Sequence, residues 1–421
     1  MNRDQAAFET AEALNSGCHC VTVELPALRA AVQARLATDG LPADLAASHP
    51  HLFARAPVFL SAAHVHSMAG TVRAVEAAVA LPAYREAALR WAPEIARHDS
   101  GARGAFLGFD FHLSADGPKL IEINTNAGGG FLAAMLGDAA LACCGSAAGR
   151  GQDLPRFEQR ALDMLVEEWH LAGHPGRPRA IAVVDESPDS QYLHPEFLLA
   201  QNALRRAGMA AVIASPGELH LRGGVLHARG EPVDLVYNRL TDFALDAPEH
   251  RALREAYLGG NAVVTPNPRA HALYADKRLL GLLGDAAWLR GAGLDPALAD
   301  LLGAVVPATA VVRSEDGARL WQERRTLFFK PFAGYGSRGA YRGDKLTRRV
   351  FEEILRGGYV AQSLVPPGER VPAEDGTPLK FDVRNFAYGG EVQLLAARLW
   401  QGQTTNFRTE NGGFAPVIAV P

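Results

Sequence analysis

The spacing of apolar and polar positions predicts helices at the start of the chain. Helical periodicity and good helix formers run through residues 3–17 and 71–98, and again through 154–173. The first two stretches predict that residues 1–104 form a mostly helical N-terminal region.

From residue 180 the pattern changes to short, continuous apolar runs that are typical of buried strands. Strands are predicted at 180–185, 209–215 and 232–238, and a helix that ends at a glycine is predicted at 194–208. Strand, helix and strand at this spacing predict a small βαβ domain over residues 178–265.

The last third of the chain mixes both kinds of element. Helices are predicted through 274–283 and 346–357. Strands are predicted over 307–312, 326–332, 359–365 and 391–400. The fold class that follows is mixed, α+β / α/β.

One predicted hairpin carries unusual chemistry. The segments "GFDFHL" and "KLIEIN" alternate as strands, and "SADGP" between them is a turn sequence. If the loop runs from Ser114 to Pro118, then Leu113 pairs with Lys119. Further out, the same register sets Asp110 opposite Glu122 and Gly108 opposite Asn124.

The hairpin therefore brings three oxygen-bearing side chains to one face. Two carboxylates opposite each other on a ladder, about 5 Å apart, repel. A Mg²⁺ ion would remove that repulsion, because carboxylate and amide oxygens are ligands that it accepts. The alternative is a solvated face that happens to be acidic.

A second constellation follows a predicted strand that carries Lys330. The segment "TLFFKPFAGYGSRGAYRG" contains GxGxxG, but no helix opens at its third glycine, so a dinucleotide fingerprint is rejected. Glycine amides beside Lys330 and Arg338 instead suit a phosphate cradle. The alternative is a glycine-rich surface hairpin with incidental cations.

A third segment, "KFDVRNFAYGGEVQLLAARLW", reads as a hairpin that turns at Gly389 and Gly390. Asp382 and Arg384 lie two residues apart and share a face. A simple ion pair between these two side chains is the structural alternative to a functional role for Arg384.

Composition narrows the class of protein. The 421 residues are 48% hydrophobic and 21% charged, which is typical of a globular enzyme-sized chain of two or three subdomains. The formal net charge of −4 argues against a nucleic-acid-binding protein. No apolar run of transmembrane length and no signal peptide are visible, so a cytoplasmic protein without a membrane association is expected.

Together these motifs resemble the ATP-grasp ligases, in particular the circularly permuted branch that includes glutathionylspermidine synthetase. The pieces of the family's ATP site occur in a consistent cyclic order, with the hairpin "GFDFHLSADGPKLIEINTNAGGG" first instead of last. The resemblance covers roughly residues 105–130 and 180–421, and it leaves the helical N-terminus unassigned.

The resemblance implies a role for each matching residue. Asp110, Glu122 and Asn124 would bind Mg²⁺, and Arg338 and Arg384 would stabilise the transferring phosphoryl group. The ATP contacts that it implies are Lys277, Lys330, Gln362, Asn406 and the lid-loop residues Gly334, Gly336, Ser337 and Gly339. The glycines after Asn126 would leave room where a substrate meets the γ-phosphate.

The same resemblance implies a domain plan. Residues 105–177 would hold the metal hairpin and the helix after it, 178–265 an accessory domain, and 266–421 the ATP-binding subdomains. The helical region 1–104 would precede them.

The implied activity is an ATP-dependent carboxylate–amine ligase that forms ADP and works through an acyl phosphate. Its cofactors would be ATP and Mg²⁺, and its partners would be a small-molecule acid and a small-molecule amine. The oligomeric state is left open, with a homodimer as one alternative. Two alternatives remain, a small-molecule kinase on the same ATP site and a nucleotide-binding regulator without turnover.

Overall fold

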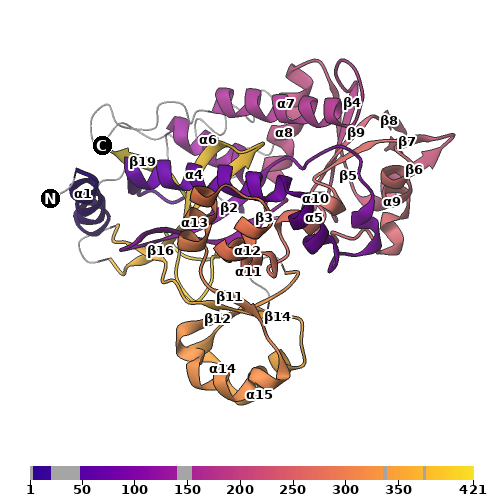
Figure 1. Cartoon of the computed structure of the whole chain (residues 1–421). Helices are drawn as coiled ribbons and strands as arrows, with labels where there is room; N and C mark the ends of the chain where they lie inside the picture. The colour runs from indigo at the N-terminus through magenta and orange to yellow at the C-terminus, as the bar shows by residue number, and fades with distance from the viewer. Residues whose placement is uncertain (1–2, 20–47, 140–153, 335–338, 373–375) are drawn as a thin grey trace.

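The computed structural model describes residues 3–19, 48–139, 154–334, 339–372 and 376–421 (Figure 1). Helices and sheets are mixed throughout this part of the chain, which confirms the mixed fold class. The described strands form five sheets.

The central sheet is antiparallel, with the order β18-β17-β16-β2-β3 and with β15 paired to β16. Its strands are β2 (Leu107–Ser114), β3 (Gly117–Asn124), β15 (Gly368–Arg370), β16 (Leu379–Tyr388), β17 (Glu391–Trp400) and β18 (Gly413–Ala415). Because side chains alternate along β2, Phe109 and Phe111 point to one face while Asp110 and His112 point to the other.

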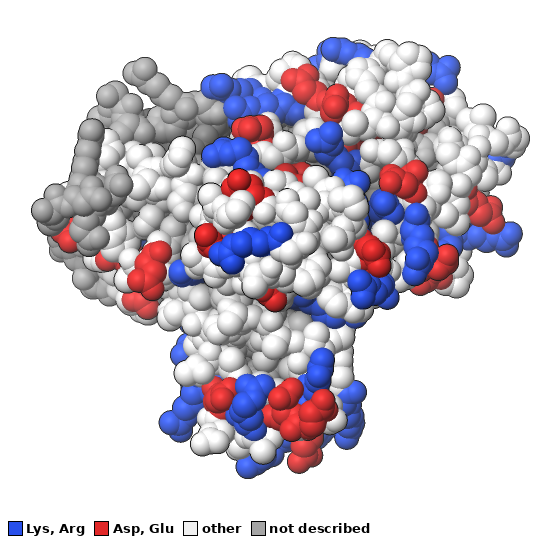
Figure 2. All heavy atoms as spheres, in the orientation of Figure 1, with Lys and Arg blue, Asp and Glu red and all other residues white. Residues whose placement is uncertain are grey.

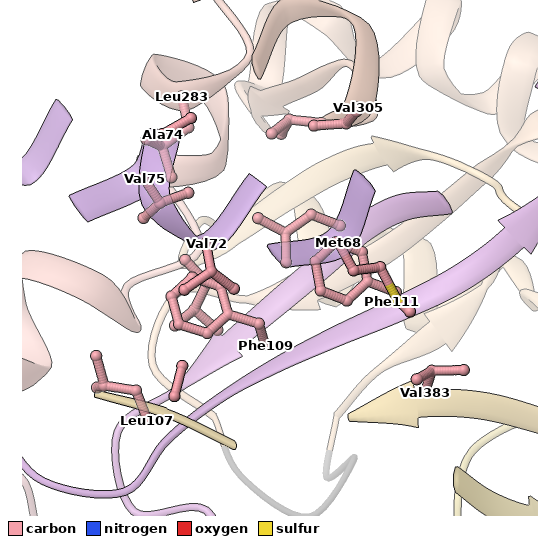
Figure 3. Close-up of a cluster of buried hydrophobic side chains, with 14 of the residues drawn as sticks. Met68, Val72, Ala74, Val75, Leu107, Phe109, Phe111, Leu283, Val305 and Val383 are labelled. Carbon is pink, nitrogen blue, oxygen red and sulfur yellow. The ribbon is translucent and has the colours of Figure 1, made fainter. Parts of the chain in front are cut away.

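The apolar face of the central sheet is covered by α4 (Ala62–Ala80) and α13 (Pro296–Val305). Met68 and Val72 of α4 pack against Phe109 and Phe111 in a fully buried cluster (Figure 3). This packing fixes β2 in place and turns Asp110 towards the opposite face.

The prediction of one continuous helix over residues 71–98 is wrong. The chain forms α4, then α5 (Pro82–Leu89), then the 3₁₀ turn η1 (Glu94–Arg97). Pro82 disfavours the helical conformation in the residue before it, and Leu81 is extended. The predicted helix at residues 3–17 is confirmed as α1 (Arg3–Gly17).

A strand also interrupts the N-terminal region that was predicted to be helical. The buried segment β1 (Val58–Ser61) pairs in parallel with β19 (Val417–Val420) near the end of the chain. Four apolar or small residues cannot be told from a helix segment by periodicity alone, so only the partner strand decides its conformation.

A second sheet is parallel and has the strand order β10-β9-β4-β5. Its strands are β4 (Ala180–Val184), β5 (Ala210–Ala214), β9 (Leu235–Asn238) and β10 (Val263–Thr265). One face packs on α6 (Gly130–Ala139), α7 (Leu154–Leu171) and α8 (His194–Arg206). The other packs on α9 (Arg251–Leu258) and on the small sheet of β6 (Leu219–Arg222), β7 (Val225–Ala228) and β8 (Glu231–Val233).

These elements confirm the predicted strands and helix between residues 180 and 215, and the helix predicted over 154–173. The strand predicted over 232–238 is instead divided into β8 and β9, which belong to different sheets. The hairpin β6–β7 and strand β10 were not predicted.

A small lobe at the bottom of Figure 1 holds a sheet of order β11-β14-β12-β13. It consists of β11 (Thr309–Val311), β12 (Leu327–Pro331), β13 (Tyr341–Arg342) and β14 (Tyr359–Ser363), backed by α14 (Gly317–Glu323) and α15 (Arg348–Leu355). Thr347 caps α15 by accepting the Val350 N–H at 3.3 Å, as expected of a helix that begins near residue 346.

The helix predicted through 274–283 is broken. Helix α10 (Pro268–Tyr274) ends at the first residue of this range, and α11 (Leu279–Leu283) begins after a turn that contains Lys277. Helix α12 (Ala286–Gly291) follows. The remaining 3₁₀ turns are η2 (Pro188–Ser190), η3 (Pro216–Glu218), η4 (Pro248–His250), η5 (Ser314–Asp316), η6 (Arg324–Thr326) and η7 (Gly343–Lys345).

The β2–β3 hairpin has the predicted register at its functional end but not at its turn. Asp110 lies opposite Glu122, and Gly108 lies opposite Asn124, as predicted. Leu113, however, pairs with Pro118, because the turn is tighter than the predicted loop. A bulge after Asp110 adds one residue to β3 and cancels the difference.

On the side of the molecule seen in Figure 2, basic and acidic residues are interspersed, and this holds for the small lobe as well. Of the helices that the structure describes, none combines the length and the apolar character needed to cross a bilayer.

Candidate functional site

A cavity of about 1100 Å³ opens where the central sheet, the small lobe and the parallel sheet meet. The predicted site residues that line it are Asp110, Glu122, Asn124, Lys277, Lys330, Gly334, Gln362, Arg384 and Asn406. The structure therefore brings together residues that are up to about 300 positions apart. Gly339 is described but is not a lining residue, and Gly336, Ser337 and Arg338 lie outside the described residues.

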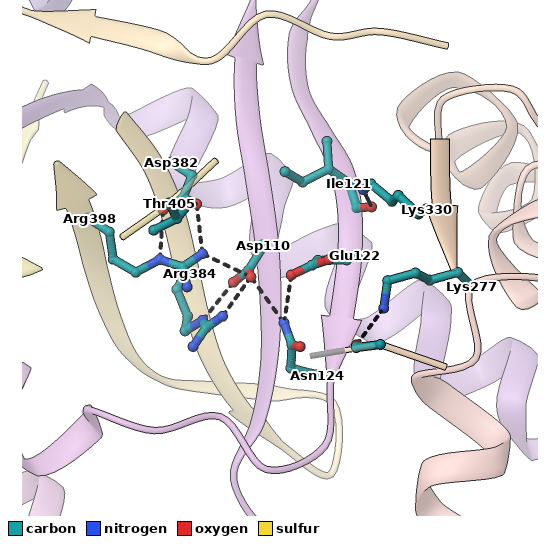
Figure 4. Close-up of polar contacts among 11 residues, drawn as sticks. Asp110, Ile121, Glu122, Asn124, Lys277, Lys330, Asp382, Arg384, Arg398 and Thr405 are labelled. Carbon is teal, nitrogen blue, oxygen red and sulfur yellow. Dashed lines mark hydrogen bonds and ion pairs between the residues drawn. The ribbon is translucent and has the colours of Figure 1, made fainter. Parts of the chain in front are cut away.

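The end of the β2–β3 hairpin forms one wall (Figure 4). The Asn124 Nδ2 group donates to Asp110 Oδ2 at 3.0 Å and to Glu122 Oε1 at 3.2 Å. Because the amide nitrogen faces both carboxylates, the Asn124 oxygen is left without a partner among the described residues. The predicted convergence of the three side chains on one face is thus present.

Two arginines, Arg384 on β16 and Arg398 on β17, engage Asp110. Arg384 donates from Nε and Nη2 to the two carboxylate oxygens, each at 2.6 Å, and Arg398 donates to Oδ2 at 2.9 Å. Burial favours the neutral form of Asp110, but the two guanidinium groups outweigh it and hold its pKa below the ordinary value. Asp110 is therefore an ionised carboxylate in a buried cluster.

The ion pair considered between Asp382 and Arg384 does not form. Asp382 instead accepts from Arg398 at 2.9 and 2.6 Å and from the Thr405 hydroxyl at 3.0 Å. In the ladder, Asp382 lies opposite Arg398, and Arg384 lies opposite Asp110. Cross-strand neighbours are closer than residues two apart on one strand, so they win the pairing.

Two lysines form the facing wall. Lys330, on β12, donates to the Ile121 carbonyl at 2.8 Å, and Lys277 donates to the Gly334 carbonyl at 3.2 Å. Both side chains are buried. Burial lowers the pKa of Lys330 to about 8, and Lys277 adds to this shift while Glu122 opposes it.

Glu122 is held ionised by the same lysines. Burial would raise its pKa, but Lys277 and Lys330 outweigh burial and keep the pKa below its ordinary value. A carboxylate and two ammonium groups therefore face one another across the cavity.

Gln362 and Asn406 line the cavity, and the side-chain amide nitrogen of each is already engaged. Gln362 is buried on β14 and donates to the Thr309 hydroxyl at 3.1 Å. The Asn406 amide donates to the carbonyls of Gln401 at 2.9 Å and Thr404 at 3.2 Å, and it orders the loop between β17 and β18. For both residues, direct ligand contact stays a prediction.

The three glycines after Ala127 do not all open space for a substrate. Gly128 lines the cavity beside Arg239. A side chain at Gly129 would overlap the Phe414 ring, and one at Gly130 would overlap Phe157. The expectation that this run leaves room at the phosphates is therefore wrong for Gly129 and Gly130, which allow close packing.

The cavity is also lined by two charged residues, Arg239 and Asp185, that the sequence analysis did not single out. Arg239 follows β9 and is 7% exposed, and its Nη1 donates to the Asn126 carbonyl at 2.8 Å. Its Nε is buried and has no partner among the described residues. Asp185 follows β4, and burial raises its pKa to about 6, although Arg239 opposes the shift. Polar residues at the carboxyl ends of parallel strands were the available signal.

Beside the cavity, a buried histidine joins two carboxylates. His250 Nδ1 lies 2.7 Å from Asp242 Oδ2, and Nε2 lies 2.5 Å from Glu186 Oε1. Glu186 lines the cavity, and Glu249 lies close enough to complete a group that could hold a metal ion. Both ring nitrogens of His250 therefore lie within hydrogen-bonding distance of a carboxylate.

No family model matches the chain, and no curated protein matches it. Among solved structures, a glutathione synthetase-like effector from Globodera pallida in its apo form has a TM-score of 0.54 at 12% identity. The likeness covers 94% of this chain and 98% of the effector. It shows that the two proteins share their overall fold.

Two further solved structures are more distant. A putative gamma-glutamylcysteine synthetase from Methylobacillus flagellatus KT has a TM-score of 0.47 at 12% identity, over 85% of this chain and 88% of the other. The ATP-grasp ligase PsnB, complexed with a minimal precursor, Mg and ADP, has a TM-score of 0.28 at 17% identity, over 56% of this chain and 88% of PsnB. The fold likeness rests on the first structure alone.

Proposed function

We propose that the chain is an ATP-dependent carboxylate–amine ligase on a circularly permuted ATP-grasp fold. The observation that carries the proposal is the meeting of Glu122 and Asn124 with Lys277 and Lys330 in one large cavity. These four residues come from three separate parts of the sequence. The fold shared with a glutathione synthetase-like protein supports the architecture.

The donor set suits a magnesium ion. Glu122 is ionised and partly exposed to the cavity, and the Asn124 oxygen is unpaired among the described residues. Asp110 is engaged by two arginines, but its Oδ1 accepts only one N–H and keeps a lone pair. The three residues would hold the ion, which when bound would neutralise phosphate charge.

The lysines would bind the phosphates of ATP. Lys277 and Lys330 now donate to backbone carbonyls, and each ammonium has further N–H groups for phosphate oxygens. Backbone amides of the loop from Gly334 to Gly339, Ser337 included, would complete the cradle. Gln362 lies on β14 where the connector would read the adenine.

The reaction would proceed in two steps. An oxygen of the substrate carboxylate attacks the γ-phosphorus, and the bond to the β-phosphate oxygen breaks to release ADP. The amine then attacks the acyl carbon, and phosphate leaves as the amide forms. Arg384, and Arg338 in the loop, would stabilise the negative charge of the transferring group.

The part of the cavity around Arg239 would bind the rest of a substrate. Arg239 keeps an unused guanidinium edge beside Gly128, and an anionic group on either substrate would fit it. The cavity of about 1100 Å³ has room for a nucleotide and a second molecule.

The test is ADP formation across panels of acids and amines. A ligase releases ADP and phosphate only when both substrates are present. A stable phosphorylated product would indicate the kinase, and binding of ATP without turnover would indicate the regulator.

Glu122→Gln is expected to lower kcat/KM by at least about 100-fold, because a ligand of the metal is lost. The matched control is Glu369→Gln, an exposed glutamate on β15 outside the cavity, which should retain full activity. Unchanged amide formation by Glu122→Gln would rule out the proposed site.

A further inference from the structure

His112 lies in the predicted hairpin motif and lines the cavity, but the sequence pattern gave it no role. It lies on β2 two positions after Asp110 and therefore shares the face that carries the site. Its ring is partly exposed and lines the cavity, together with Ile121 of β3 and Phe328 of β12. This end of the cavity also contains the chain from Gln362 to Pro367, which leaves β14.

One hydrogen bond fixes the tautomer of His112. Its Nδ1 lies 2.7 Å from the carbonyl oxygen of Val365. A carbonyl oxygen can only accept, so Nδ1 carries the proton and Nε2 carries a lone pair.

The lone pair of Nε2 has no donor among the described residues. Nε2 is not a fully buried atom, so a ligand can reach it. It is reached from the cavity, because the His112 ring lines that cavity. The site thus presents a fixed hydrogen-bond acceptor beside two apolar side chains, Ile121 and Phe328, on opposite sheets. A flat ring between these side chains, with an N–H or O–H group at its edge, matches that arrangement.

We propose that Nε2 of His112 accepts a hydrogen bond from the nucleoside part of the bound nucleotide and so sets nucleotide selectivity. The inference rests on the proposed function, since it takes the ligand to be ATP. The donor is either the exocyclic amine of adenine or a hydroxyl of the ribose. If the amine is the donor, a guanine base would present a carbonyl in its place and would be disfavoured by the acceptor.

The experiment measures nucleotide binding by calorimetry with ADP and Mg²⁺, without acid or amine substrates. His112→Phe keeps an aromatic ring but has no acceptor, and its ADP affinity should fall about three- to tenfold, the range for one hydrogen bond. His112→Gln can donate to Val365 and still offer an oxygen, so it should bind ADP nearly as well as the wild type.

The matched control is His227→Phe. His227 also has its Nδ1 beside a backbone carbonyl, that of Val225 at 3.1 Å, but it lies on β7 outside the cavity. Its substitution should leave ADP affinity unchanged. Folding of each variant is checked by its thermal unfolding midpoint.

Nucleotide analogues identify the donor. IDP lacks the amine, and 2′-deoxy-ADP and 3′-deoxy-ADP each lack one hydroxyl. The analogue that lacks the donor should bind more weakly than ADP to the wild type but as well as ADP to His112→Phe, because the interaction is already lost there. Equal ADP affinity of wild type and His112→Phe overturns this inference alone. A wild type that binds no nucleotide overturns the ligase proposal and this inference with it.

Discussion

At the residue scale, the number of cations beside a carboxylate decides its protonation in this cavity. Glu122 faces two lysines, and its pKa stays below the ordinary value although burial opposes this. Burial raises the pKa of Asp185 to about 6, and the opposing effect of Arg239 does not outweigh it. One cavity therefore holds two carboxylates with opposite behaviour.

The raised pKa of Asp185 predicts a pH-dependent stability. The folded pKa of about 6 exceeds the ordinary 3.8, so the folded chain has a penalty that develops as pH rises from 3.8 and is complete above about 6. Asp185→Asn should raise the free energy of unfolding by about 2 kcal/mol at pH 7.5 and by less than half of that at pH 4.5. Urea unfolding at both pH values measures it.

The control is Asp116→Asn, because Asp116 is an exposed carboxylate at the β2–β3 turn. It should change the free energy of unfolding little at either pH. A stabilisation of Asp185→Asn that is the same at both pH values would contradict the prediction.

At the element scale, the segment after β3 shows why three glycines follow the β2–β3 hairpin. Gly129 has a φ of +95°, and a Cβ there would lie 1.9 Å from the Phe414 ring of β18. The close approach lets α6 begin against the central sheet. The glycine run thus serves the packing that places Asn124 and Asn126 at the cavity.

Two glycines of this region allow the packing effect to be separated from the backbone effect. Gly117 has nearly the same φ, +96°, but a Cβ there would meet nothing within 4 Å. Gly117→Ala should therefore cost about 1 kcal/mol from the backbone alone, and Gly129→Ala at least about 3 kcal/mol, because the Phe414 contact adds overpacking. Chemical denaturation compares them, and equal losses would show that Phe414 moves aside freely.

At the scale of the whole molecule, segments near the two ends of the chain meet. β1 pairs with β19, and helix α1 packs beside them (Figure 1). Arg370 on β15 is fully buried and donates to the carbonyls of Asn15, Pro57 and Cys18 at 3.0, 2.7 and 2.6 Å. One side chain thus ties α1 and the segment before β1 to the central sheet.

Arg370→Met should lower the free energy of unfolding by about 3 kcal/mol, because two buried carbonyls and the partly buried carbonyl of Cys18 lose a donor. It should also make helix α1 more sensitive to limited proteolysis. Arg349→Met, an exposed arginine on α15, is the control and should behave as the wild type. Unchanged stability of Arg370→Met would show that α1 docks without this side chain.

The sequence by itself determined the local patterns. Strand alternation placed Asp110, Glu122 and Asn124 on one face, since a period of two needs no distant partner. Amphipathic spacing likewise determined α1, α7 and α8, and the strand that carries Lys330. The resemblance then gathered these pieces into one site, and the cavity does bring the described ones together, apart from Gly339.

Only the tertiary structure decided the features that depend on distant neighbours. The partner of Arg384 is Asp110, 274 positions away, and not the nearby Asp382. The break around Lys277 and the placement of His112 and Arg239 in the cavity also follow from segments that meet only after folding. Periodicity describes which face a residue occupies, but the contacts across sheets decide what that face touches.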